Sequence, residues 1–127
     1  MKIVLDTYAW IEFFNGSEAG KKVGNILNSK ENEIFTSIIT IAEMSSKLKR
    51  ENLDAEKGYE IITNSSKIYF MNPELAKEAG LLHAEMKKKI KDFGMIDSII
   101  LSTARKLGAK IVTGDPHFKG FKEAILI

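Results

Sequence analysis

The chain has 127 residues, of which 44% are hydrophobic and 28% are charged, and its formal net charge is +2. This composition is typical of one soluble globular domain over residues 1–127. The absence of cysteine excludes disulfide scaffolds, thiol catalysis and cysteine–zinc sites, and it fits a reducing compartment. No apolar run approaches the roughly 20 residues that span a bilayer, and no signal peptide is recognised. We therefore expect a cytoplasmic protein with no membrane partner.

The first part of the chain predicts a buried strand followed by two helices. Residues 2–5 form a short apolar run that stops at an acid. Residues 8–14 are apolar nearly all round and predict a short helix, which ends at the turn signal Asn15-Gly16. Ser17 and the acid after it predict the start of a second helix, which continues to about residue 28.

The middle of the chain predicts two strands that enclose two further helices. Residues 33–36 read as the second strand. Ser37 is a suitable N-cap for a helix whose apolar positions extend to Leu48. Asp54 is a candidate cap for the next helix, which ends near residue 64. Residues 67–71 alternate around Ile68 and Phe70 and predict the third strand.

The remaining residues predict two helices and two strands. Asn72-Pro73-Glu74 combines a capping amide, a proline at the first helical position and an acid in the first turn. The break at Phe93-Gly94 separates that helix from another over residues 96–107. Strands follow over residues 110–113 and 124–127. Strands that alternate with helices predict an α/β domain with a mostly parallel sheet of four or five strands.

Four carboxylates stand near the ends of predicted strands or at the start of a helix, or follow a strand within two helical turns. Asp6 ends the first strand, Glu43 lies about two turns into the helix after the second, and Asp115 follows the fourth. Asp97 begins the last long helix. All four are embedded in apolar sequence, whereas most other acids have polar neighbours. In open parallel sheets, ligands bind at the carboxyl ends of the strands where the strand order reverses. We therefore expect these four acids to converge.

An oxygen-only ligand set suits Mg²⁺ or Mn²⁺ and does not suit zinc. Such ions activate a water and stabilise in-line displacement at phosphorus. Each acid also has a simpler structural interpretation. Asp6 and Asp97 fit helix caps, Glu43 fits a solvated helix face, and Asp115 fits an Asp-Pro turn. Asp115 is the least certain of the four as a direct metal ligand, because it could instead hydrogen-bond to the ligands and orient them.

The sequence at these acids resembles a known family, the PIN-domain ribonucleases, and in particular the VapC toxins of VapBC toxin–antitoxin pairs. The segments that carry the resemblance are VLDTYAWIEFF, TSIITIAEM, IDSIILSTARKLGA and TGDPHF, in this order and over essentially the whole chain. No segment is specific alone, but the ordered set is. The resemblance implies a three-layer PIN-like fold with helices on both sides of a short sheet.

The resemblance also implies roles for individual residues. Asp6, Glu43, Asp97 and Asp115 match the catalytic, metal-binding acids, and the hydroxyls of Thr7 and Thr113 match assisting groups. The implied activity is metal-dependent endoribonuclease cleavage that leaves 5′-phosphate and 3′-hydroxyl ends. The implied partners are an RNA substrate, a VapB-like antitoxin and a second copy of the chain.

The sequence departs from the family pattern at three places. Tyr8 stands where many relatives have a small polar residue, and Ile96 precedes the third acid where many have alanine. Pro116 and His117 occupy a stretch in which some relatives carry a further acid. We expect His83 and His117 to be structural or surface residues.

Two surfaces are further candidates for binding. Lys87, Lys88 and Lys89 are expected to contact RNA, and Trp10, Phe13 and Phe14 are expected to form a surface for a protein partner. A second basic cluster, Lys47, Lys49 and Arg50, fits a solvated helix face.

Other functions stay open at this point. They are a PIN-like RNA-processing nuclease without an antitoxin, and a non-catalytic module that binds nucleic acid or protein. A haloacid-dehalogenase-type phosphotransferase would need an acid where Tyr8 stands, and a receiver-like domain would need a lysine where Thr113-Gly114 stands.

Overall fold

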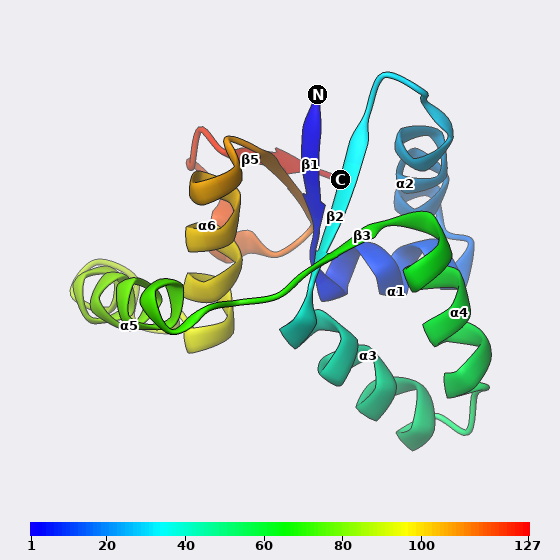
Figure 1. The fold of residues 1–127 in the computed structure, drawn as a ribbon, viewed down its shortest axis with the longest axis horizontal. Helices are drawn as coiled ribbons and strands as arrows, with labels where there is room; N and C mark the ends of the chain where they lie inside the picture. The colour runs from blue at the N-terminus through cyan, green and yellow to red at the C-terminus, as the bar shows by residue number, and fades with distance from the viewer.

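The computed structural model describes all of residues 1–127 and shows a five-stranded sheet between two sets of helices (Figure 1). The strands are β1 (Lys2–Leu5), β2 (Glu33–Ser37), β3 (Lys67–Tyr69), β4 (Lys110–Thr113) and β5 (Ala124–Leu126). The helices are α1 (Thr7–Asn15), α2 (Glu18–Asn28), α3 (Ile38–Arg50), α4 (Ala55–Ser65), α5 (Pro73–Lys87) and α6 (Met95–Leu107), with a short 3₁₀ helix, η1, over Pro116–Phe118. None of the helices has the length and apolar character that would be needed to cross a membrane.

All four strand pairings are parallel, and the strand order is β3-β2-β1-β4-β5. Val4 of β1 lies opposite Phe35 of β2 on one side and Ile111 of β4 on the other. The chain builds the sheet outward from β1 to β3 and then returns to the other side of β1 for β4 and β5. The strand order therefore reverses between β1 and β4, which is where a ligand site is expected in such a sheet.

Alternating side chains of β1 divide the core into two parts. Ile3 and Leu5 face a cluster built with α1, α2, α3 and α4, whereas Val4 faces a cluster built with α6 and Phe93. Helices α1 to α4 accordingly cover one face of the sheet, and α6 covers the other with α5 packed outside it (Figure 1). This arrangement confirms the expected three-layer α/β fold.

The capping residues expected from the sequence hold the helix ends. The side chains of Ser17, Ser37, Asp54 and Asn72 each accept a hydrogen bond from a backbone amide in the first turn of the following helix. Gly108 ends α6 with a φ of 65°, a left-handed conformation that favours glycine. Several boundaries differ from the expectation by one residue. Strand β3 ends at Tyr69, two residues earlier than expected, and the next residue, Phe70, is 73% exposed.

The assignment of Trp10 to a partner surface is wrong. Its side chain is fully buried, and its indole Nε1 donates a hydrogen bond to Thr36 Oγ1 at 3.1 Å. The apolar character of α1 all round is explained by this burial and by the packing of Phe13 and Phe14 against Trp10, with ring centroids 5.8 and 6.0 Å away. Phe13 and Phe14 are themselves only partly buried.

Candidate active site

The four acids singled out in the sequence line one pocket of about 120 Å³ at the carboxyl ends of β1 and β4. They come from four separate elements: the end of β1, α3, the first turn of α6 and the loop after β4. The residues that line the pocket are Asp6, Thr7, Tyr8, Glu43, Ile96, Asp97, Ile100, Asp115 and Phe118. No lysine or arginine lines this pocket, so its negative charge has no basic partner among the lining residues.

Each aspartate also caps the helix that begins beside it. Asp6 Oδ1 accepts the Ala9 amide at 2.9 Å in the first turn of α1. Asp97 Oδ2 accepts the Gly94 amide at 3.0 Å at the start of α6. Asp115 Oδ1 accepts the amide of His117 at 2.9 Å in η1. The structural interpretations of these acids are therefore correct, and they do not compete with a functional role. The positive ends of the helix dipoles help to hold negative charge here.

Burial dominates the electrostatics of Asp6. The side chain is 6% exposed, and this burial raises its pKa from 3.8 to about 7. Bonds to the Thr113 hydroxyl and the Ala9 amide lower the pKa, and the charges of Asp115 and Asp97 raise it further. Without a cation, the buried carboxyl of Asp6 therefore keeps its proton to a much higher pH than an exposed aspartate does.

The pKa of Asp97 is also raised by some contacts and lowered by others, although this side chain is less buried than Asp6. Burial raises the pKa of its carboxyl, and the nearby charge of Asp115 raises it too, whereas bonds to Gly94 and His117 act in the opposite direction. Carboxyl groups whose ionised form is disfavoured by burial and by one another gain most from a bound cation. Because the donors are mainly carboxylate oxygens, the pocket fits a hard divalent cation such as Mg²⁺ or Mn²⁺.

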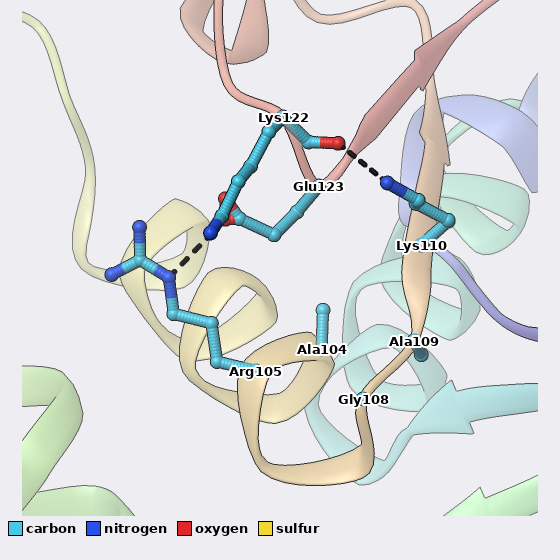
Figure 2. A pocket seen from close by; sticks show the side chains of 7 residues that line it. All are labelled: Ala104, Arg105, Gly108, Ala109, Lys110, Lys122 and Glu123. Atoms are coloured by element: carbon cyan, nitrogen blue, oxygen red, sulfur yellow. Dashed lines mark hydrogen bonds and ion pairs between the residues drawn. The ribbon is translucent and has the colours of Figure 1, made fainter.

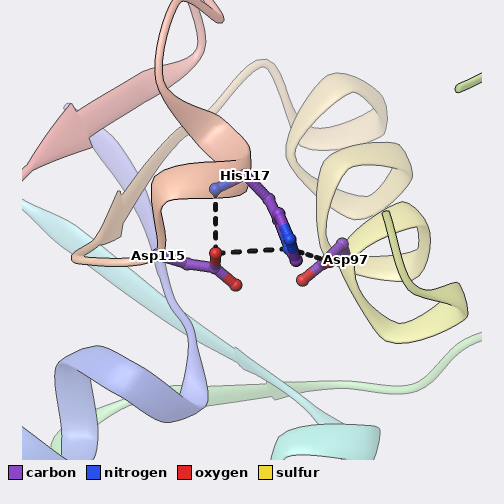
Figure 3. Close-up of side chains that lie close together, drawn as sticks. All are labelled: Asp97, Asp115 and His117. Atoms are coloured by element: carbon purple, nitrogen blue, oxygen red, sulfur yellow. Dashed lines mark hydrogen bonds and ion pairs between the residues drawn. The ribbon is translucent and has the colours of Figure 1, made fainter. Parts of the chain in front are cut away.

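His117 is the residue of this site that the sequence analysis missed. Figure 3 shows its ring between Asp97 and Asp115, with Nδ1 3.0 Å from Asp97 Oδ2 and 3.3 Å from Asp115 Oδ1. Asp97, Asp115 and His117 offer three ligand atoms that lie within 4.8 Å of one another. The turn of η1 brings His117 back toward Asp97, and a histidine two residues after an acid gave no sign of this in the sequence.

The two threonines lie beside the acids as expected. Thr7 Oγ1 donates a short hydrogen bond to Glu43 Oε1 and so connects α1 with α3 across the pocket. Thr113 is fully buried behind the pocket, and its Oγ1 accepts the Asp115 amide at 2.9 Å. Both hydroxyls therefore hold acidic residues in place.

Tyr8 forms part of the rim of the pocket. Its side chain is 42% exposed, and its ring lies so close to the backbone of Gly114 that any Cβ there would overlap it. An exposed ring held against backbone can stack on an unpaired base. The other residues assigned to RNA, Lys87, Lys88 and Lys89, are exposed around the end of α5 and do not line the pocket.

A wider cavity of about 550 Å³ lies at the other end of the strands, around the start of β4 and the end of α6 (Figure 2). Two of the three cations that line it have partners: Arg105 Nε lies 3.3 Å from Glu123 Oε2, and Lys110 Nζ donates to the carbonyl oxygen of Lys122 at 2.8 Å. The only acid that lines it, Glu123, is the partner of Arg105. Size alone therefore does not mark the reactive site.

Comparisons with known proteins agree with this fold. A family model described as the PIN domain matches residues 3–124. A search of curated proteins finds no match. The Mycobacterium tuberculosis toxin VapC20, described as cleaving the sarcin–ricin loop, shares 20% identity at a TM-score of 0.78, over 95% of this chain and 97% of that one.

Two complexes give similar results. VapBC2 from Rickettsia felis, bound to a DNA fragment from its promoter, matches at 22% identity and a TM-score of 0.76, over 100% of this chain and 98% of that one. A toxin–antitoxin complex from Klebsiella pneumoniae matches at 23% identity and a TM-score of 0.74, over 97% and 95%. At these identities the structures establish a shared fold, and the family model covers nearly the whole chain. The chain belongs to the PIN-domain family.

Proposed function

We propose that this protein is a divalent-metal-dependent ribonuclease and the toxin of a toxin–antitoxin pair. One observation carries the proposal: four carboxylates from four elements line a single pocket without a basic lining residue, in a chain whose PIN-domain match spans residues 3–124. Acids placed in this way repel one another and destabilise the fold, so a scaffold role alone gives no reason to bring them together.

Asp6, Asp97 and Asp115 would hold Mg²⁺ or Mn²⁺, with Glu43 completing the acidic wall. A bound cation would supply water activation and neutralise charge on the phosphate. The chain itself provides the positioning. Thr7 orients Glu43, and His117 places a ring nitrogen beside Asp97 and Asp115, where it would serve as a further ligand.

RNA is the proposed substrate and an antitoxin the proposed partner. The fold neighbours support both, because one is described as a toxin that cleaves the sarcin–ricin loop and others are toxin–antitoxin complexes. Phe13 and Phe14, partly exposed on α1, are the proposed contacts with a protein partner or a second copy of the chain. A role in binding RNA phosphates is still a prediction for Lys87, Lys88 and Lys89. Replacing all three by Ala should reduce the salt dependence of RNA binding if they serve that role.

The decisive experiment is RNA cleavage by the purified protein, followed by sequencing of the new ends. Cleavage should require Mg²⁺ or Mn²⁺, stop with EDTA, and leave 5′-phosphate ends. The matched variant is Glu43→Gln, which keeps the shape and an oxygen acceptor for Thr7 while removing the charge. Cleavage that continues in EDTA, or in Glu43→Gln at the parental rate, would contradict the proposal.

A further inference from the structure

A second groove continues from the acidic pocket along α3. Its volume is about 400 Å³, and it shares Thr7 and Glu43 with the pocket of acids. The residues that line it are Thr7, Ala42, Glu43, Ser46, Lys47 and Arg50. The hydrogen bond from Thr7 to Glu43 lies where the two cavities meet. A chain that reaches the acids therefore has a continuous path onto the surface of α3.

The helical period places the cations of α3 in one line with Glu43. Lys47 and Arg50 follow Glu43 by four and seven residues, which is the spacing of one helix face and places them roughly 6 and 10 Å further along the axis. The buried stripe of α3, which includes Met44 and Leu48, faces the core. Lys49 points elsewhere, about 120° round the axis from Glu43, and it does not line the groove.

The charges of the groove complement those of the pocket. A phosphodiester strand that enters the pocket meets four acids, and cations immediately outside offset that repulsion. Arg50 Nε donates to Ser46 Oγ at 3.3 Å, a contact that leaves the terminal nitrogens of the guanidinium free. Lys47 Nζ lies 3.4 Å from Glu51 Oε1, and its side chain is 34% exposed, so it lies low along the groove wall.

We propose that this groove binds the backbone of the RNA strand on one side of the scissile phosphate, with Lys47 and Arg50 contacting successive phosphates. The inference rests on the proposed ribonuclease function and adds the path of the substrate. It also assigns a role to the basic cluster on α3, which in the sequence fitted a solvated face. The lining favours a polar backbone over a peptide segment, because Ala42 is its only apolar residue and helical or extended peptides bind through apolar anchors.

The test compares K47Q/R50Q with Lys49→Gln. All three residues lie in the last turn of α3, so the control has the same helix environment and differs in the direction of the side chain. Binding of a fluorescein-labelled single-stranded RNA of mixed sequence is measured by anisotropy against salt concentration, with Mg²⁺ present. An added Asp97→Asn change in every protein keeps the RNA intact.

We expect K47Q/R50Q to lower the slope of log affinity against log salt by about 1.4, since each lost phosphate contact on a single strand removes roughly 0.7. Affinity at 0.1 M salt should fall about 25-fold if the binding curves converge at 1 M. Lys49→Gln should follow the parent. Loss of the Lys47–Glu51 ion pair should change stability by less than about 1 kcal/mol, which thermal melting checks.

The possible results distinguish a failure of the proposed RNA path from a failure of the proposed ribonuclease function. If the parent cleaves RNA in a metal-dependent way but K47Q/R50Q binds like Lys49→Gln, the path proposed here is wrong and the ribonuclease function stands. If the parent neither binds nor cleaves RNA, both proposals fail. If the double variant keeps its RNA affinity and instead loses a co-purifying protein partner, the groove belongs to that partner, which also overturns the proposal.

Discussion

Replacing Asp6 by Asn should make the metal-free protein more stable at neutral pH. The fold buries this carboxyl and raises its pKa from 3.8 to about 7. The folded state therefore binds the proton more tightly than the unfolded chain does. The resulting stability is fully present below the unfolded pKa and is lost as the pH rises through the folded pKa. Asn carries no such proton, and its side-chain oxygen still caps α1 by accepting the Ala9 amide.

The size of the effect follows from the two pKa values. A difference of three units corresponds to about 4 kcal/mol in total. Integration between pH 5 and pH 8 leaves about 2.5 kcal/mol, because part of the loss occurs below pH 5. Since other titrating groups are common to both proteins, they cancel when the pH dependence of the parent is compared with that of Asp6→Asn.

The assay is urea unfolding in EDTA at pH 5 and pH 8. Asp6→Asn should gain about 2.5 kcal/mol on the parent between these two pH values. The matched control is Asp54→Asn, because Asp54 caps α4 in the same way but lies exposed. If Asp6→Asn and the parent lose stability equally with pH, Asp6 is ionised at little cost in the fold, and the electrostatic argument for a cation site fails. Added Mg²⁺ should stabilise the parent more than the variant at pH 8.

Substitutions at three other residues test the remaining parts of the site. Asp97→Asn should abolish RNA cleavage and leave the melting temperature in EDTA equal or higher; a clearly lower melting temperature with cleavage retained would make Asp97 a scaffold residue. His117→Asn should weaken binding of Co²⁺ or Ni²⁺ about tenfold more than that of Mg²⁺, since imidazole favours the transition metals. Thermal-shift titrations measure this, and equal effects would exclude the ring from the ligand set. Tyr8→Ala should raise the KM for RNA about tenfold, as for one lost base stack, while Tyr8→Phe should not; equal KM values for both would rule out stacking.

Sequence patterns predicted the order of the elements because local signals and burial agree along most of this chain. Ser37 and Asn72 each cap a helix at the expected position, and the apolar runs at residues 2–5 and 110–113 became the central strands β1 and β4, each with three successive buried residues. The two errors have a common cause, which is that contacts between distant segments decided the outcome. Trp10 resembles a surface aromatic until β2 supplies the Thr36 acceptor for its indole.

His117 joined the site for a similar reason. Only the turn at η1 and the packing of α6 bring its ring to Asp97, 20 residues away in the chain. The four acids were recognisable because three of them stand at the end of an element and all four lie in apolar sequence. How they share one pocket depends on the reversal of strand order between β1 and β4, which the pattern of elements left undetermined.

Each aspartate of the pocket both caps a helix and contributes a carboxylate to the candidate site. This double role affects what happens to the protein when a mutation removes the carboxylate. Asparagine caps a helix about as well as aspartate, and one base change converts an aspartate codon into an asparagine codon. A lineage that lost the proposed activity through such a change would therefore keep a folded protein with its outer surfaces intact. An inactive copy of this kind still occupies any partner that recognises those surfaces, so loss of the chemistry leaves a competitor in the cell rather than an absence.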